Sequence, residues 1–135
     1  MSADVPFGFF LSGGLDSSLL VSMACLEFNK QVSTYSVTFP EFQYSESYFQ
    51  QLIVSKFGTI HHEIISTNRN FTENFIYASS MSDTPLLIPN YTQIFQLAQL
   101  AKEKVKVLIT GEGADEIFGG YGIHLLPWKC GLGYL

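Results

Sequence analysis

Short apolar, β-branched runs alternate along this chain with longer segments whose apolar residues recur at helical spacing. The runs predict strands at residues 7–11, 32–39, 59–66 and 105–110. The segments between them predict helices at 15–27, 45–57, 71–81 and from 89 or 90 to 104. Strands joined through helices require crossover connections, which build a parallel sheet. The sequence therefore predicts an α/β fold with an open parallel sheet and helices on both faces.

Apolar residues recur at helical spacing in each predicted helix. In the first helix the recurring residues are Leu15, Leu19, Ser22, Met23 and Leu26. The residues predicted to point inward are Tyr48, Phe49, Leu52, Ile53 and Phe57 in the second helix and Ile94, Leu97, Ala98 and Ala101 in the fourth. In the third helix Phe71, Phe75 and Ala78 share one face. Gly111–Gly120 is predicted to be a glycine-rich acidic loop, and the tail from 122 to 135 has no clear period.

Composition narrows the possible partners. Hydrophobic residues make up 47% of the chain and charged residues 14%, which is typical of a folded domain. Seven Lys and Arg against twelve Asp and Glu give a net charge of −5, and Arg69 is the only arginine, so we expect no nucleic-acid partner. The apolar runs are too short to cross a bilayer, so we expect no membrane span. Cys25 and Cys130 match no disulfide or metal framework, and we expect free thiols and a cytoplasmic location.

The first candidate site is the run Ser12-Gly13-Gly14-Leu15-Asp16-Ser17-Ser18, between the first strand and the first helix. Glycines let backbone N–H groups converge on an anion, the helix adds its positive end, and the serines add small donors. A carboxylate in such a cradle would repel a phosphate unless a cation lay between them, so Asp16 indicates Mg²⁺. The simpler alternative is a turn in which Asp16 caps the helix; the complete run favours a phosphate site.

The second candidate site is Thr110-Gly111-Glu112-Gly113-Ala114-Asp115-Glu116, directly after the fourth strand. Three carboxylates within five residues repel one another unless a cation is present, whereas the alternative is a solvated acidic turn. In a doubly wound sheet, ligands bind where the strand order reverses. If the fourth strand lies beside the first, both loops share one edge, and Asp16 and Asp115 can grip one or two Mg²⁺ ions on a polyphosphate.

These motifs carry a resemblance to a known family. The run 12–18 resembles the pyrophosphate loop of the N-type ATP pyrophosphatases, whose fold is adenine-nucleotide alpha-hydrolase-like. The run 111–121, with Asp83-Thr84-Pro85 and residues 58–63 before it, is similar to the synthetase domain of glutamine-hydrolysing asparagine synthetases. The resemblance implies an ATP-dependent amide ligase that adenylates the side-chain carboxylate of aspartate, releases pyrophosphate and forms asparagine with ammonia derived from glutamine.

The resemblance also implies roles for individual residues. Glu112 would lie at the reacting centre and deprotonate ammonia, and Asp16 and Asp115 would bind Mg²⁺. The residues implied to hold ATP and its pyrophosphate are Leu11, Ser12, Gly13, Gly14, Asp16, Ser17, Ser18, Val37, Thr110 and Gly111, with Leu11, Val37 and Gly111 around the adenosine.

Further expectations about the whole protein follow from the resemblance. Because the family domain continues beyond the Gly-Gly-Tyr run, residues 1–135 are expected to be a partial synthetase domain. The family's glutaminase domain needs a cysteine directly after the initiator Met, and Ser2 stands there, so no glutaminase domain is expected. An unburied face is expected to self-associate or to receive the missing synthetase segment. Two alternatives stay open: a relative that adenylates another carboxylate, in a β-lactam-forming or peptide-cyclising synthetase, and a non-catalytic nucleotide-binding remnant or interaction module.

Overall fold

A four-stranded parallel sheet forms the centre of the computed structural model, which describes residues 4–28, 31–40, 46–86 and 90–122. The strands are β1 (Phe7–Phe10), β2 (Ser33–Thr38), β3 (Ile60–Ile65) and β4 (Val107–Ile109). The helices are α1 (Leu15–Phe28), α2 (Ser47–Phe57), α3 (Asn68–Ser80), α4 (Asn90–Ala101) and α5 (Ala114–Phe118). The strand order is β3-β2-β1-β4, and all neighbours pair in parallel. The predicted α/β class is confirmed.

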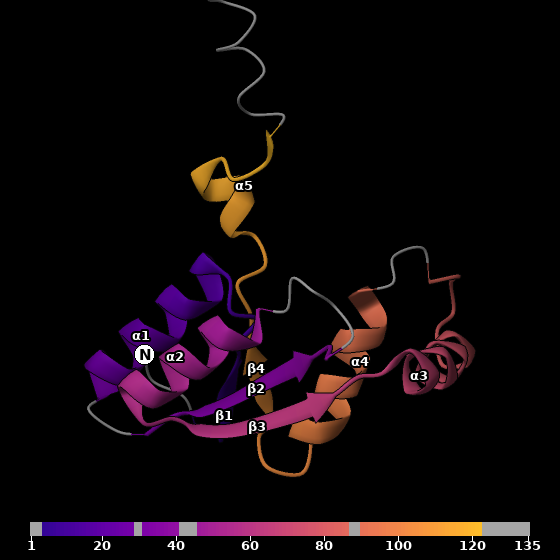
Figure 1. Cartoon of the computed structure of the whole chain (residues 1–135), viewed down its shortest axis with the longest axis horizontal. Coiled ribbons are helices and arrows are strands. Elements are labelled where there is room, and N and C mark those ends of the chain that lie inside the picture. Colours follow the sequence, from indigo (N-terminus) through magenta and orange to yellow (C-terminus); the bar gives the residue numbers. More distant parts are fainter. Residues whose placement is uncertain (1–3, 29–30, 41–45, 87–89, 123–135) are drawn as a thin grey trace, which may run out of the picture.

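Helices α1 and α2 lie side by side on one face of the sheet (Figure 1). The alternation along β1 sends Phe9 to this face, where it joins the fully buried Leu11 beyond the end of the strand. Val21 and Ala24 of α1 pack against them, and Ile53 and Val54 of α2 border the same cluster. This packing fixes the helix that begins directly after the β1 loop.

Helix α4 covers the opposite face of the sheet. Tyr35 and Val37 of β2 form a second buried cluster with Leu97 and Ala101 of α4. Helix α3 packs against α4 through the rings of Tyr77 and Phe95, whose centroids lie 5.6 Å apart. The sheet is therefore covered on both faces, as predicted.

The predicted inward face of α2 is largely wrong. Tyr48, Phe49 and Leu52 are exposed, whereas the polar Gln50 is only 3% exposed. Hydrogen bonds explain this orientation, because the Gln50 carboxamide bonds to the main chain at the ends of β1 and β2. On α4 the prediction holds for Leu97 and Ala101 but not for Ile94 and Ala98, which are exposed, while Thr92 and Gln96 are buried.

The recurring apolar residues of helix α1 also point largely outward. Leu15 and Leu26 are 83% and 74% exposed, and the buried positions are Ser17, Val21 and Ala24. Ser17 is held inward by hydrogen bonds to the loop that precedes the helix. On α3, Phe71, Phe75 and Ala78 lie on the less exposed side, as predicted.

The predicted helix boundaries differ from those of the structure by up to three residues, as at the start of α3, which is Asn68 rather than residue 71. Helix α4 ends at Ala101, and the chain turns through Lys104 before β4, so the predicted end at Lys104 is three residues too long. The predicted acidic loop contains a short helix, α5. Of the tail, residues 123–135 lie outside the described residues. None of the helices in the described ranges is long and apolar enough to cross a membrane.

Candidate functional site

The loops after β1 and β4 meet at one edge of the sheet. Strand β1 lies between β2 and β4, so the order of the strands reverses beside it, and both loops leave the carboxyl ends of neighbouring strands. Gly111 shows how closely the loops approach. A Cβ atom at this position would lie 3.2 Å from Asp16 Cβ and from Ser17 N. The predicted juxtaposition of the two loops is confirmed.

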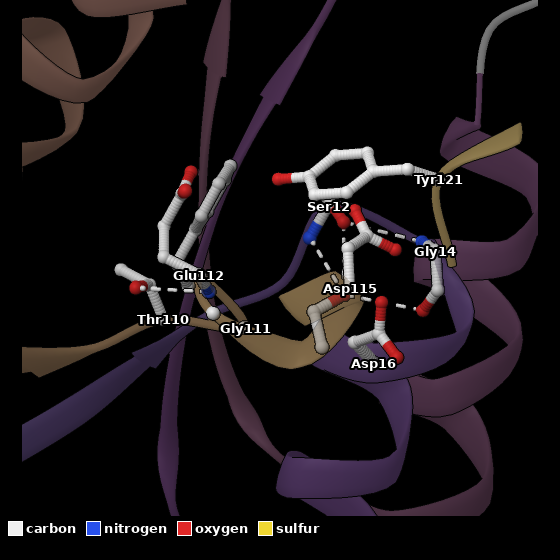
Figure 2. A pocket seen from close by; sticks show the side chains of 11 residues that line it. Ser12, Gly14, Asp16, Thr110, Gly111, Glu112, Asp115 and Tyr121 are labelled. Atoms are coloured by element: carbon white, nitrogen blue, oxygen red, sulfur yellow. Dashed lines mark hydrogen bonds between the residues drawn. The ribbon is translucent and has the colours of Figure 1, made fainter. Parts of the chain in front are cut away.

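An open pocket of about 210 Å³ lies between the two loops (Figure 2). Its lining combines hydroxyls, glycines, carboxylates and two aromatic rings. The residues are Phe10, Ser12, Gly14, Asp16, Ser17, Thr110, Gly111, Glu112, Gly113, Asp115 and Tyr121. These described lining residues include no lysine or arginine.

Two serines fix the shape of the β1 loop. Ser17 Oγ accepts a hydrogen bond from Ser12 N at 3.2 Å, lies 2.9 Å from Ser12 Oγ, and donates to Gly14 O at 3.2 Å. Ser12 Oγ in turn accepts from Gly14 N at 3.2 Å. These bonds close the loop on the first turn of α1, whose leading N–H groups have no acceptors within the helix. The loop therefore presents a rigid helix N-terminus to the pocket.

The β4 loop brings carboxylates to the other side of the pocket. Gly113, with φ of 89°, leads into α5, which carries Asp115 and Glu116 in its first turn. The Tyr121 hydroxyl donates to Glu116 Oε1 at 2.7 Å. This hydrogen bond raises the pKa of Tyr121, and the negative charges of Glu116, Asp115 and Glu112 raise it further. Glu112, Asp115 and Glu116 make this side of the pocket negatively charged.

The donor set of the pocket fits a hard divalent cation. Asp16, Glu112 and Asp115 all line the pocket (Figure 2). Carboxylate oxygens are the protein ligands that Mg²⁺ prefers, together with waters and substrate phosphates. Among the described residues no group of three or more His, Cys, Asp and Glu side chains is arranged to hold a metal unaided. A cation here would need oxygen ligands from a bound polyphosphate or from water.

Most of the predicted site residues lie together. Ser12, Gly14, Asp16, Ser17, Thr110, Gly111, Glu112 and Asp115 all line the pocket. The other four, Leu11, Gly13, Ser18 and Val37, are outside its lining. Leu11 and Val37 are buried in the clusters on opposite faces of the sheet, so their contact with adenosine stays a prediction.

Sequence reasoning did not single out three lining residues, Phe10, Gly113 and Tyr121. Gly113 and Tyr121 lie inside the run 111–121, whose composition marked the site. Phe10 is the last residue of β1, and its position directly before the β1 loop could have indicated that it lines the site.

Comparison with known proteins identifies the family. The sequence model of the family described as asparagine synthase matches residues 1–132. The chain belongs to the asparagine synthase family. A putative glutamine-hydrolysing asparagine synthetase 2 of Methanocaldococcus jannaschii is 37% identical over 131 residues, which are 96% of this chain and 25% of that protein. The glutamine-hydrolysing asparagine synthetase 1 of Bacillus subtilis is 36% identical over 127 residues, 94% of this chain and 20% of that protein. The chain thus spans a quarter or less of the length of these curated relatives.

Solved structures support the fold of this asparagine synthase family chain. The NMN synthetase of Francisella tularensis has a TM-score of 0.60 and 22% identity, over 86% of this chain and 49% of that one. The NH3-dependent NAD synthetase of Campylobacter jejuni has a TM-score of 0.61 and 16% identity, over 90% of this chain and 53% of that one. Identity at this level shows the fold alone, which is of the adenine-nucleotide alpha-hydrolase type, as predicted.

Proposed function

We propose that this chain forms the nucleotide-binding part of an ATP-dependent amide ligase. The observation that carries the proposal is the pocket between the loops that follow β1 and β4, in which a helix N-terminus, two serine hydroxyl groups and three carboxylates converge. A triphosphate is the kind of ligand that can use both the anion-binding loop and a cation held by the carboxylates. Membership of the asparagine synthase family supports ATP as the nucleotide, and the names of the relatives, which are glutamine-hydrolysing asparagine synthetases, support an amide product.

In the proposed reaction, an oxygen of the aspartate side-chain carboxylate attacks the α-phosphorus of ATP. The bond from that phosphorus to the bridging oxygen breaks, and pyrophosphate leaves. Ammonia then attacks the carbonyl carbon of the acyl adenylate, AMP leaves, and the nitrogen loses a proton. Atoms and charge balance with one carboxylate, one ATP and one ammonia, and in the relatives' names glutamine is the source of the nitrogen.

Different residues of the pocket would serve different steps of this reaction. The β1 loop, with Ser12, Gly14 and Ser17 held by their mutual hydrogen bonds, would bind the β- and γ-phosphates without reorganising. Asp16 and Asp115 would hold Mg²⁺, which supplies positive charge to the leaving pyrophosphate when bound. Glu112 would accept the proton from the attacking nitrogen, since it lies in the same pocket and a carboxylate is a competent base.

The test is the affinity for ATP with and without Mg²⁺, measured by titration calorimetry on the 135-residue chain. Asp16→Asn should weaken binding of Mg²⁺–ATP at least about tenfold, because a charge-assisted contact contributes roughly 1.5–3 kcal/mol. Glu27→Gln is the matched control, since it removes a carboxylate from the far end of the same helix and should leave the affinity unchanged. Equal affinity of the wild type with and without Mg²⁺ would overturn the metal assignment. Pyrophosphate release measured with aspartate and with other acids would identify the carboxylate.

A further inference from the structure

Gln50 is the most unusual buried side chain near the pocket. It lies in the first half of α2 and is 3% exposed, although the apolar Phe49 and Leu52 on the same helix are 55% and 46% exposed. Burying a carboxamide is unfavourable unless both of its polar ends form hydrogen bonds. The rotation of α2 that hides Gln50 and exposes its apolar neighbours is therefore set by what the carboxamide binds.

The carboxamide joins the ends of β1 and β2. Gln50 Nε2 donates to Ser12 O at 2.9 Å and to Val37 O at 3.4 Å, and Gln50 Oε1 accepts from Thr38 Oγ1 at 3.2 Å. The backbone hydrogen bonds between β1 and β2 end just before Ser12 and Val37, where Leu11 N donates to Tyr35 O at 2.8 Å. Two carbonyl oxygens cannot bond to each other, whereas a primary amide has two N–H groups and can bridge them. Glutamine satisfies this need, and an ionised glutamate or an apolar side chain does not.

The bridge also sets the direction of the Ser12–Gly13 peptide group. No described peptide bond is cis, and in a trans peptide the C=O and the following N–H point in opposite directions. Because Gln50 holds Ser12 O toward α2 and β2, the N–H of Gly13 is directed away from them. Gly13 has a φ of 95° and could accommodate the reversed peptide orientation, since glycine tolerates both signs of φ. The glycine alone does not fix the orientation, and the carboxamide does.

We propose that Gln50 is a positioning residue that locks the Ser12–Gly13 peptide in its observed orientation, with Ser12 O held toward α2 and β2 and the Gly13 N–H directed away from them, and that the β1 loop binds a polyphosphate in this orientation. This inference rests on the proposed function for its ligand, but the lock itself is a property of the free protein. Among the described residues that line the pocket, Ser12 is the one to which the Gln50 side chain forms a hydrogen bond, and Gln50 itself does not line the pocket. Its effect on binding therefore passes through the main chain of the β1 loop.

The experiment compares Gln50→Met, which keeps the length of the side chain but has no donor, with Gln51→Met, its exposed neighbour on the same helix. The first measurement is the residual dipolar coupling of the Gly13 N–H in the ligand-free 135-residue chain. The second is the affinity for Mg²⁺–ATP by calorimetry. In Gln50→Met the Gly13 coupling should change while the couplings in β1 and β2 stay as in the wild type, and the affinity should fall about tenfold, as expected for one buried hydrogen bond lost. Gln51→Met should change neither.

The outcomes separate the lock from the proposed function. A Gly13 coupling that is the same in Gln50→Met and the wild type overturns the lock, whatever the affinity. Couplings that change throughout β1 and β2 also overturn it, because Gln50 would then support the fold in general. If the wild type does not bind Mg²⁺–ATP but the Gly13 coupling changes selectively in Gln50→Met, the lock stands and the proposed function fails.

Discussion

Gly13 gives the sharpest test of how the β1 loop is packed. Its φ of 95° is in the region that disfavours side chains, and a Cβ atom there would lie 2.7 Å from Glu46 O and 2.9 Å from Glu46 Cβ. The loop is thus pressed against the residue that precedes α2. The substitution Gly13→Ala should therefore destabilise the fold through two separate effects.

The two effects have different magnitudes. A left-handed backbone conformation costs a residue with a Cβ atom about 1–2 kcal/mol. Forcing an extra methyl group into a packed region costs about 1–3 kcal/mol more, and the nearest atom here is a backbone oxygen that cannot rotate away. Gly13→Ala should lower the free energy of unfolding by about 2–5 kcal/mol, a large share of the 5–15 kcal/mol typical of a single domain.

Gly58→Ala separates these effects. Gly58 ends α2 with a φ of 62°, and a methyl group added there would have Gln31 Nε2 as its nearest neighbour at 3.8 Å, an ordinary contact. This control should cost only the conformational part, about 1–2 kcal/mol. Urea unfolding followed by circular dichroism measures both variants against the wild type. If Gly13→Ala is no less stable than Gly58→Ala, the β1 loop is not packed on the start of α2 as described, and the reasoning about this loop fails.

Two further predictions concern pH and association. Burial lowers the pKa of His61, against a smaller opposing effect of Glu63, so the unfolded chain takes up a proton before the folded one as the pH falls below about 6.5. The free energy of unfolding should therefore decrease as the pH falls below that value. In urea titrations, His61→Gln should make the free energy of unfolding depend less on pH than in the wild type. The same pH dependence in both proteins would contradict this prediction. The exposed Leu19 and Leu26 on α1 should promote self-association. The double variant Leu19→Gln and Leu26→Gln should therefore sediment with a lower apparent mass than the wild type at equal concentration. Its free energy of unfolding should differ from that of the wild type by less than about 0.5 kcal/mol. An unchanged sedimentation profile would exclude this face.

The positions of the strands along the chain and of the two site loops could be predicted because each depends on local signals. β-branched and aromatic runs marked the strands, and the crossover rule made the sheet parallel. The run 12–18 followed a strand and opened a helix, and the run 111–116 followed another strand, so only their adjacency had to be assumed. The pairing of β1 with β4 supplies that adjacency. The alternation of side chains along β3 places His61 and His62 on opposite faces: His61 Nδ1 lies 3.0 Å from Thr34 Oγ1, and the ring of His62 packs on Tyr35.

The rotations of α1 and α2 could not be predicted, because hydrogen bonds to the β1 loop determine them. Ser17 and Gln50 are the side chains that bond to this loop, and each turns its own helix so that a polar residue is buried. A search for apolar periodicity favours the opposite faces, since it treats serine and glutamine as surface residues. Helix α1 has apolar residues on both sides, with Val21 and Ala24 inside and Leu19 and Leu26 outside. A helix that is apolar all round is typical of burial on both sides. The periodicity therefore indicated a real apolar face on α1, but one that points away from the sheet and leaves a surface for another protein segment or a second copy of the chain.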